Sequence, residues 1–420
     1  MRPIPIILLL IFVSFPPLYA QPDSLAPARE CTVRSGLPTF FQKLKSGQPV
    51  KIAYFGGSIT EAGNGWREQS LKGLQQAYPK SAITHINAAI GGTGSDLGAF
   101  RLRQHVLDHA PDLVLVEFAV NDNGRQPDLI HRTMEGIVRQ IWRQFPRTDI
   151  AFVYTLTAAM APILEQGKLP ASATAMEKVA DYYGIPSIHM GLEVVKLAQN
   201  GKLVYRGKPE AYPDKLVFSN DNVHPYPTTG HRLYAEAFAR AIQHLQNQGQ
   251  PQMHRLPKPL LADNWERAAM APVRVVSRSA HWQEITPATD TVARQLQNRF
   301  TYLVKANQAG AKMTIRFKGT QLGLYDVMGP GCGQYSVSID GQPARKYPRF
   351  DEYCTYYRSN YFLLPELPDG IHTVELTLSD EPLDKAAILQ KRGNAINDPR
   401  RYAENAGYAS QVLLIGELVD

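Results

Sequence analysis

The stretch Asp112–Asp122, DLVLVEFAVND, decides the class of fold. It is almost continuously apolar, which is typical of a strand that helices cover on both faces of a parallel sheet. Further apolar runs of strand length lie around it, at residues 51–55, 83–88, 150–155 and 185–188. Segments with apolar residues at helical spacing separate these runs, at residues 65–78, 95–109, 130–145, 171–183 and 228–246. Strands that alternate with helices predict a parallel sheet with helices on both faces.

The pattern changes after residue 249. Residues 250–263, QPQMHRLPKPLLAD, are rich in proline and read as a linker. Beyond them apolar residues alternate with polar ones, and Asp340-Gly341 predicts a tight turn. The alternating runs are residues 312–317, 335–339, 372–378 and 411–418. We therefore expect an α/β domain at 21–249, a linker at 250–263 and an all-β sandwich of the jelly-roll type at 264–420.

The N-terminus, MRPIPIILLLIFVSFPPLYAQ, has the pattern of a secretory signal peptide. Arg2 precedes an apolar run over residues 4–15, which is short for a bilayer span, and Ala20 offers a small residue before Gln21. We expect residues 1–20 to be cleaved near Ala20-Gln21 and the protein to be secreted or periplasmic; the alternative is a membrane anchor. No later segment of the sequence is long and apolar enough for an integral membrane span.

Charge and cysteine content limit the other classes. The formal charge is +7, and the basic residues are dispersed, which favours a solvated surface over a site for an acidic polymer. No nucleic-acid-binding motif is present, and the sequence leaves the oligomeric state unknown. The three cysteines match no zinc pattern. Cys332 and Cys354 are expected to pair as a disulfide in an oxidising compartment, with Cys31 left over; the alternative is that all three are reduced and buried.

Ser58 follows the first strand in the segment Gly56–Thr60, GGSIT. Ligands of open α/β sheets bind beyond the carboxyl ends of the strands, so a serine there can project its hydroxyl into that crevice. The alternative is that the serine caps the next helix. A serine nucleophile also needs a base. Asp221 and His224, in SNDNVHP, are spaced so that the carboxylate can hold one imidazole nitrogen while the other faces outward. Taken alone, such a pair is better explained by an aspartate that holds a turn and a histidine on the surface.

Two further segments offer donors for an oxyanion. The N–H of Gly92, in GGTG after the second strand, can point into the crevice, and the side-chain amide of Asn121 lies where the strongest strand ends. Each also has a plain reading, as a strand-to-helix turn and as a loop asparagine that bonds its own backbone.

Together these segments resemble the blocks of the SGNH (GDSL-like) hydrolase superfamily, in the family's order, over residues 50–247. Ser58 stands in the first block, Gly92 in the second, Asn121 in the third and the pair Asp221 and His224 in the last. Two positions depart from the usual pattern: Gly57 replaces an aspartate and Ala119 a glycine. The resemblance implies a flavodoxin-like sheet and a serine esterase that needs no metal or cofactor. It assigns Ser58, His224 and Asp221 to the triad and Ser58, Gly92 and Asn121 to the oxyanion hole.

Family members with a signal peptide and an added β-sandwich resemble carbohydrate esterases, and no long apolar lid adjoins the site. We therefore expect an acetylated polysaccharide or oligosaccharide as substrate. Weaker expectations are that Trp66, Asp122 and Asn123 contact it, and that tyrosines of the sandwich stack on sugars. Those tyrosines are Tyr347, Tyr353, Tyr356, Tyr357 and Tyr361. The alternatives are a lipolytic or lysophospholipid esterase, a glycan O-acetyltransferase, and a glycan-binding protein without activity.

Overall fold

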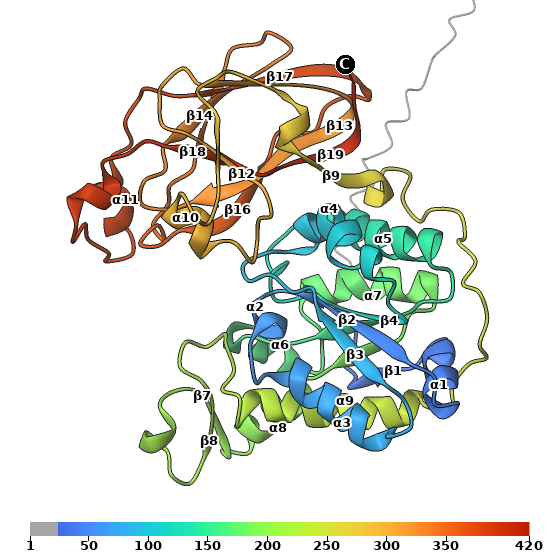
Figure 1. Ribbon diagram of the computed structural model, residues 1–420. Helices are drawn as coiled ribbons and strands as arrows, with labels where there is room; N and C mark the ends of the chain where they lie inside the picture. Colours follow the sequence, from blue (N-terminus) through green and yellow to red (C-terminus); the bar gives the residue numbers. More distant parts are fainter. Residues whose placement is uncertain (1–23, 420) are drawn as a thin grey trace, which may run out of the picture.

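The computed structural model describes residues 24–419 and contains one mainly parallel sheet followed by antiparallel sheets (Figure 1). The expected signal peptide at residues 1–20 lies outside the described residues. Within residues 24–419, no helix has the length and apolar character needed to cross a membrane.

The first sheet has six strands in the order β1-β6-β5-β4-β2-β3. They are β1 (Cys31–Thr32), β2 (Val50–Gly56), β3 (Ile83–Asn87), β4 (Leu113–Glu117), β5 (Asp149–Tyr154) and β6 (Ser187–His189). Strands β2 to β6 pair in parallel, and only the short β1 is antiparallel, to β6. This is the flavodoxin-like order, and the direction of winding reverses between β2 and β4, where ligands of such sheets bind. The expected fold class is confirmed.

Helices cover both faces of this sheet (Figure 1). They are α1 (Pro38–Lys45), α2 (Ser58–Glu61), α3 (Trp66–Ala77), α4 (Ser95–His105), α5 (Pro127–Gln144), α6 (Ala161–Glu165), α7 (Ala171–Tyr183), α8 (Leu192–Gln199) and α9 (Gly230–Leu245). Helices α4, α5 and α7 pack side by side on one face, and α3 packs beside α9 on the other. The two-stranded pair β7 (Leu203–Arg206) and β8 (Leu216–Ser219) extends from the edge of the domain. Helices α1 and α8 and the β7–β8 pair are additions to the predicted elements.

The C-terminal region is antiparallel, as expected. Its larger sheet has the order β15-β14-β17-β13-β19-β9, with β10 and β16 also paired to β13, and a smaller sheet has the order β11-β12-β18. The long strands are β13 (Lys312–Met328), β14 (Gln334–Ile339), β16 (Arg358–Leu363), β17 (Gly370–Leu378) and β19 (Gln411–Leu418). The others are β9 (Ala268–Pro272), β10 (Ser277–Arg278), β11 (Gln283–Ile285), β12 (Leu303–Ala306), β15 (Arg345–Pro348) and β18 (Gly407–Ala409), with α10 (Thr291–Gln295) and α11 (Lys385–Gln390) between strands. Jelly-roll connectivity stays a prediction.

The turn after β14 shows why the sequence pattern was informative here. Asp340 and Gly341 both have positive φ, 50° and 73°, and the Gln342 N–H donates to the Ile339 carbonyl at 2.9 Å. Two central residues with positive φ define a type I′ turn, whose twist matches that of paired strands. The predicted tight turn is confirmed.

The two parts of the chain, hereafter the α/β part (residues 24–249) and the β part (residues 264–419), share one hydrophobic core. Trp265 is buried against Phe100 of α4, with ring centroids 5.2 Å apart, and Tyr325 and Leu413 of the β part belong to the same cluster. The segment between the parts has no helix or strand, but it is held to the α/β part. Its His254 stacks on Trp142 with centroids 4.4 Å apart.

The expected disulfide is wrong, because Cys31, Cys332 and Cys354 are all free thiols. Cys332 is buried and its thiol points to the Val327 carbonyl, 3.5 Å away. The Cys354 thiol instead accepts from the Asp351 N–H at 3.3 Å. The two sulfurs are thus engaged by different local partners. The alternative of reduced, buried cysteines holds for Cys332 and Cys354, whereas Cys31 is reduced but only partly buried.

Candidate active site

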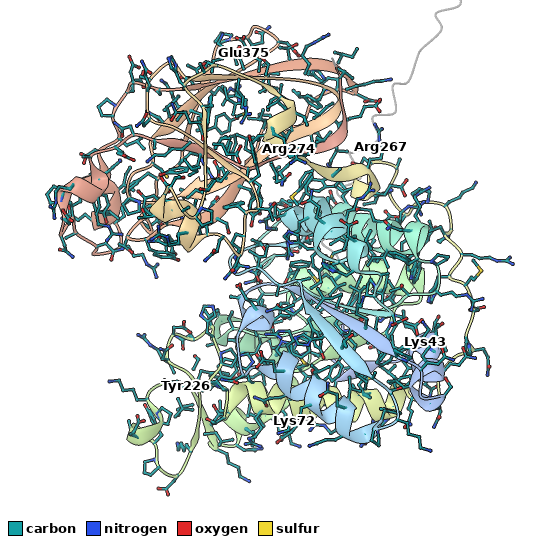
Figure 2. The ribbon with its side chains drawn as sticks, in the orientation of Figure 1. Lys43, Lys72, Tyr226, Arg267, Arg274 and Glu375 are labelled. Carbon is teal, nitrogen blue, oxygen red and sulfur yellow. The ribbon has the colours of Figure 1, made fainter. Side chains whose placement is uncertain are left out.

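Ser58 begins α2 immediately after β2 ends at Gly56, so its side chain lies at the carboxyl edge of the sheet. The loop that carries His224 lies near the C-terminal end of the α/β part in the sequence, and it reaches the same edge of the sheet. It runs from β8 to α9 and is held by Tyr226, whose N–H donates to Phe218 at 2.7 Å and whose hydroxyl donates to Gly207 at 3.1 Å (Figure 2).

A continuous hydrogen-bonded chain joins three side chains of these two loops. Ser58 Oγ lies 2.9 Å from His224 Nε2, although 166 positions separate the two residues. His224 Nδ1 lies 2.7 Å from Asp221 Oδ2. A carboxylate can only accept, so Nδ1 carries the proton, and Nε2 is left to accept from the serine hydroxyl. The arrangement is that of a nucleophile, a base and a group that orients the base.

Asp221 is held as the charged carboxylate. Burial alone would raise its pKa, but the hydrogen bond from the His224 ring and those from the N–H groups of His224 and Val223 lower it below its ordinary value. These two N–H groups donate to Oδ1 at 2.8 and 2.9 Å, which leaves Oδ2 for the imidazole. The side chains of Asp221 and His224 are 45% and 52% exposed, so the pair lies open to solvent.

Asn121 packs directly against the turn that carries Ser58. A Cβ on Gly57 would overlap the side-chain oxygen of Asn121, so position 57 has no room for any side chain while Asn121 lies there. The structure thus brings Asn121 next to the Ser58 turn.

Gly92 lies in a glycine-rich loop that follows β3. Its φ is +73°, and no atom lies within 4 Å of where its Cβ would be. The neighbouring Gly91 approaches the turn that carries Ser58, since a Cβ there would lie 3.3 Å from Ser58 Cβ. Ser58, Asn121 and the Gly91-Gly92 segment therefore meet at one place, as the sequence predicted; their roles in an oxyanion hole stay a prediction.

Two buried ionisable residues, Glu117 and Arg101, form hydrogen bonds with the segment that carries Ser58. Glu117, the last residue of β4, is 1% exposed and accepts from Thr60 at 2.9 Å, Thr155 at 2.8 Å and the Gly57 N–H. Burial raises its pKa to about 7. Arg101 of α4 donates to the carbonyl of Gly56 at 3.1 Å and to that of Ala88. Burial lowers its pKa to about 9.

The three residues expected to contact substrate, Trp66, Asp122 and Asn123, differ in their exposure to solvent. Trp66 is fully buried between Tyr54 and Phe238, so it forms part of the core and does not line the crevice. Asp122 is also fully buried, and its Oδ1 accepts from the Ser95 N–H at 3.0 Å, so it shapes the loop after Asn121. Both corrections have the same cause, which is that adjacency in sequence to a site residue does not determine which way a side chain points. Asn123 is exposed beside the site.

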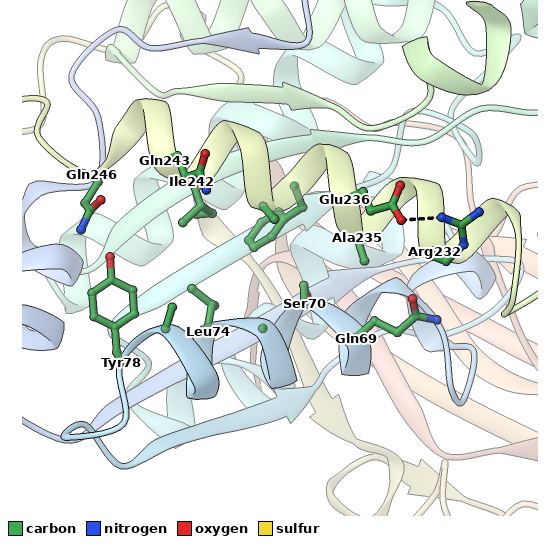
Figure 3. Close-up of a pocket in the computed structure, with 14 residues that line it drawn as sticks. Gln69, Ser70, Leu74, Tyr78, Arg232, Ala235, Glu236, Ile242, Gln243 and Gln246 are labelled. Carbon is green, nitrogen blue, oxygen red and sulfur yellow. Dashed lines mark hydrogen bonds and ion pairs between the residues drawn. The ribbon is translucent and has the colours of Figure 1, made fainter. Parts of the chain in front are cut away.

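A separate groove of about 550 Å³ lies between α3 and α9 (Figure 3). Apolar side chains such as Leu74 and Ile242 line it, and the ion pair of Arg232 with Glu236 lies at one end. None of the lining residues belongs to the segments that meet at Ser58.

Sequence reasoning missed several residues of this region. Glu117 carried a visible signal, since it is the one charged residue inside the apolar run of residues 113–120. Glu61 carried a weaker sequence signal, which is its position three residues after Ser58. Its Oε2 accepts from the Gly91 N–H at 2.7 Å, and its Oε1 pairs with Arg299. Arg299 belongs to the β part, and no local pattern links it to this site.

Comparison with known proteins gives a family match for the α/β part and a similar fold for the whole chain. Residues 54–233 match the model of the GDSL-like lipase/acylhydrolase family. No curated protein matches the chain. A two-domain esterase active on acetylated mannans, crystallised with mannopentaose, superposes with a TM-score of 0.71 at 19% identity, over 93% of this chain and 97% of that one. A second structure of a two-domain esterase active on acetylated mannans gives 0.72 at 19% identity, over 92% and 97%. The likeness is one of fold, and it extends over both parts of the chain.

Proposed function

From the match of residues 54–233 to the GDSL-like lipase/acylhydrolase family, we propose that the protein is a secreted serine esterase that removes O-acetyl groups from a polysaccharide. The observation that carries the proposal is the hydrogen-bonded chain from Asp221 through His224 to Ser58. It places a base within reach of a hydroxyl at the edge of the sheet where ligands bind.

In the proposed reaction, Ser58 Oγ attacks the carbonyl carbon of the ester while its proton passes to His224 Nε2. The negative Asp221 carboxylate stabilises the imidazolium that forms. The N–H groups of Ser58 and Gly92 and the amide of Asn121 stabilise the negative oxygen of the tetrahedral intermediate. The proton then moves from Nε2 to the departing sugar oxygen, and water releases acetate from Ser58 by the same steps.

Two observations support a substrate in which a short acyl group is attached to a polymer. His224 and Asp221 are about half exposed, so an acetyl group carried on a large molecule can approach them. Secondly, the two-domain proteins of similar fold act on acetylated mannans. In the β part, Tyr353 and Tyr356 are 43% and 55% exposed, which leaves their rings accessible for stacking on sugars. We also retain the division at residues 21–249 and 264–420 and the secretory leader at residues 1–20 as proposals.

The test is acetate release from a panel of acetylated plant and bacterial polysaccharides, by the wild type and by Ser58→Ala. We expect the wild type to release acetate, and the variant to lose at least roughly a thousandfold in kcat while its circular dichroism spectrum is unchanged. Acetyl esters should be cleaved faster than long-chain p-nitrophenyl esters. Near-normal activity of Ser58→Ala would overturn the assignment of the nucleophile, and a preference for long acyl chains would point to a lipolytic enzyme.

A further inference from the structure

We propose that two residues of the β part, Arg299 and Tyr361, are positioning residues that hold the two loops of the oxyanion hole. The inference rests on the proposed esterase function. It assigns the β part a direct effect on the chemical step, beyond any contact with a glycan.

The first link runs from Arg299 to the loop of Gly92. The Arg299 guanidinium pairs with Oε1 of Glu61, and Oε2 of Glu61 accepts from the Gly91 N–H at 2.7 Å. Both charged side chains are partly buried, with 28% and 27% exposed. Glu61 also ends the short helix that begins with Ser58, and its N–H donates to Gly57 at 2.9 Å. One carboxylate therefore connects the nucleophile turn, the glycine loop and the β part.

The same loop lies against the β part at a small cavity. Residues 86–90 line one side of this cavity of about 190 Å³, and Asn298 and Arg299 line another. Gly92 itself is exposed and has a positive φ. A loop that contains Gly91, Gly92 and Gly94 has many accessible backbone conformations, so its N–H groups are aimed only if contacts restrict it.

The second link runs from Tyr361 to the loop of Asn121. The Tyr361 hydroxyl lies 2.7 and 2.8 Å from the two carboxylate oxygens of Asp96, and it accepts from Arg125 at 3.1 Å. Arg125 in turn pairs with Asp96 at 2.6 Å and with Asp122 at 3.5 Å. Asp122 directly follows Asn121 in the chain. The hydroxyl thus completes a partly buried polar network that fixes the backbone beside the Asn121 amide.

Another ion pair between the two parts lies away from the loops of Gly92 and Asn121. Arg132 of α5 pairs with Glu366 at 3.0 Å, and this pair touches neither the Gly92 loop nor the Asn121 loop. It therefore offers a matched control, since Glu366→Gln weakens the contact between the parts without altering the contacts of the oxyanion loops.

The experiment compares Arg299→Gln, Arg299→Lys, Tyr361→Phe and Glu366→Gln in the full chain. For each we measure kcat and KM with p-nitrophenyl acetate, the inhibition constant of phenylboronic acid, and the rate at which a fluorophosphonate labels Ser58. A misplaced oxyanion donor weakens binding of the transition state more than that of the substrate. We therefore expect Arg299→Gln and Tyr361→Phe to lower kcat and the labelling rate roughly tenfold or more. KM should change by less than about twofold. The inhibition constant should rise in parallel with the loss of kcat.

Glu366→Gln should retain wild-type values, and Arg299→Lys should recover part of the loss. The proposal is overturned if Arg299→Gln and Tyr361→Phe behave like Glu366→Gln, or if they raise KM alone, which would indicate substrate contacts. Tyr361→Phe removes a single oxygen atom, so it keeps the test decisive if an arginine variant fails to fold. The labelling rate requires no assumption about the natural ester, so a failure of the acetylesterase proposal is distinguishable from a failure of this one.

Discussion

At the scale of single residues, burial of Glu117 beside the site costs free energy. This residue carries its carboxyl group at the end of a buried strand, with 1% of its surface exposed. Hydrogen bonds from Thr60, Thr155 and the Gly57 N–H offset part of the cost of burial. Because two of these donors flank Ser58 in the sequence, Glu117 couples the position of the Ser58 turn to the end of β4.

The pKa of Glu117 predicts a pH dependence of stability. Burial raises that pKa from 4.5 to about 7, so the unfolded chain loses this proton at lower pH than the folded protein does. Stability from this group is therefore greatest below pH 4.5 and is lost as pH rises to about 7, by about 3 kcal/mol. Glu117→Gln should lack this component. We would measure urea unfolding of both proteins between pH 4.5 and 8; a constant difference in unfolding free energy would contradict the prediction.

At the scale of elements, Gly57 in the turn between β2 and α2 allows the Asn121 side chain to lie close to that turn. Gly57 has ordinary extended angles, with φ −98° and ψ −157°, so an alanine would meet no backbone strain. Its Cβ would instead overlap the Asn121 side chain. The glycine at this position is required by the neighbouring loop and not by the conformation of its own backbone.

Gly57→Ala is therefore expected to displace the Asn121 amide and lower kcat by roughly a hundredfold or more, which is the usual cost of losing one oxyanion donor. The matched control is Gly63→Ala, because no atom lies within 4 Å of a Cβ there. Esterase assays and melting temperatures of both variants provide the readout. Equal kcat values for the two variants would show that Asn121 either adapts or makes no contribution.

At the scale of the whole molecule, the two parts are joined by a shared cluster of buried side chains, and the β part also has a core of its own. Trp265, Tyr325 and Leu413 share a core with helices of the α/β part, and Leu256 and Leu260 of the linker pack against the same cluster. Two main-chain N–H groups of the linker, those of Leu260 and Leu261, donate to Glu135 of α5 at 2.5 and 2.8 Å. The β part therefore does not behave as a module on a flexible tether.

A chain that ends at residue 249 would expose the apolar surface of α4 and α5 that Trp265 covers. We expect such a truncation to be insoluble, or to melt at least roughly 10 °C below the full chain. The full-length Glu366→Gln variant, which removes one ion pair between the parts, should melt within a few degrees of the wild type. A truncated chain as stable as the whole would mean that the shared core contributes little.

The sequence by itself determined the order and type of the main elements and the segments that meet at the site. Each of these follows from local information, such as the apolar run of β4, the Asp340-Gly341 turn and the spacing of Asp221 and His224. The tertiary structure alone decided that Trp66 is core, that the cysteines are free, and that Arg299 and Tyr361 reach the catalytic edge. The contacts of Arg299 and Tyr361 join residues 238 and 265 positions apart, and such contacts leave no periodic pattern in the residues around them. The burial of Trp66 and the state of the thiols depend on how individual side chains pack, which periodicity does not specify either.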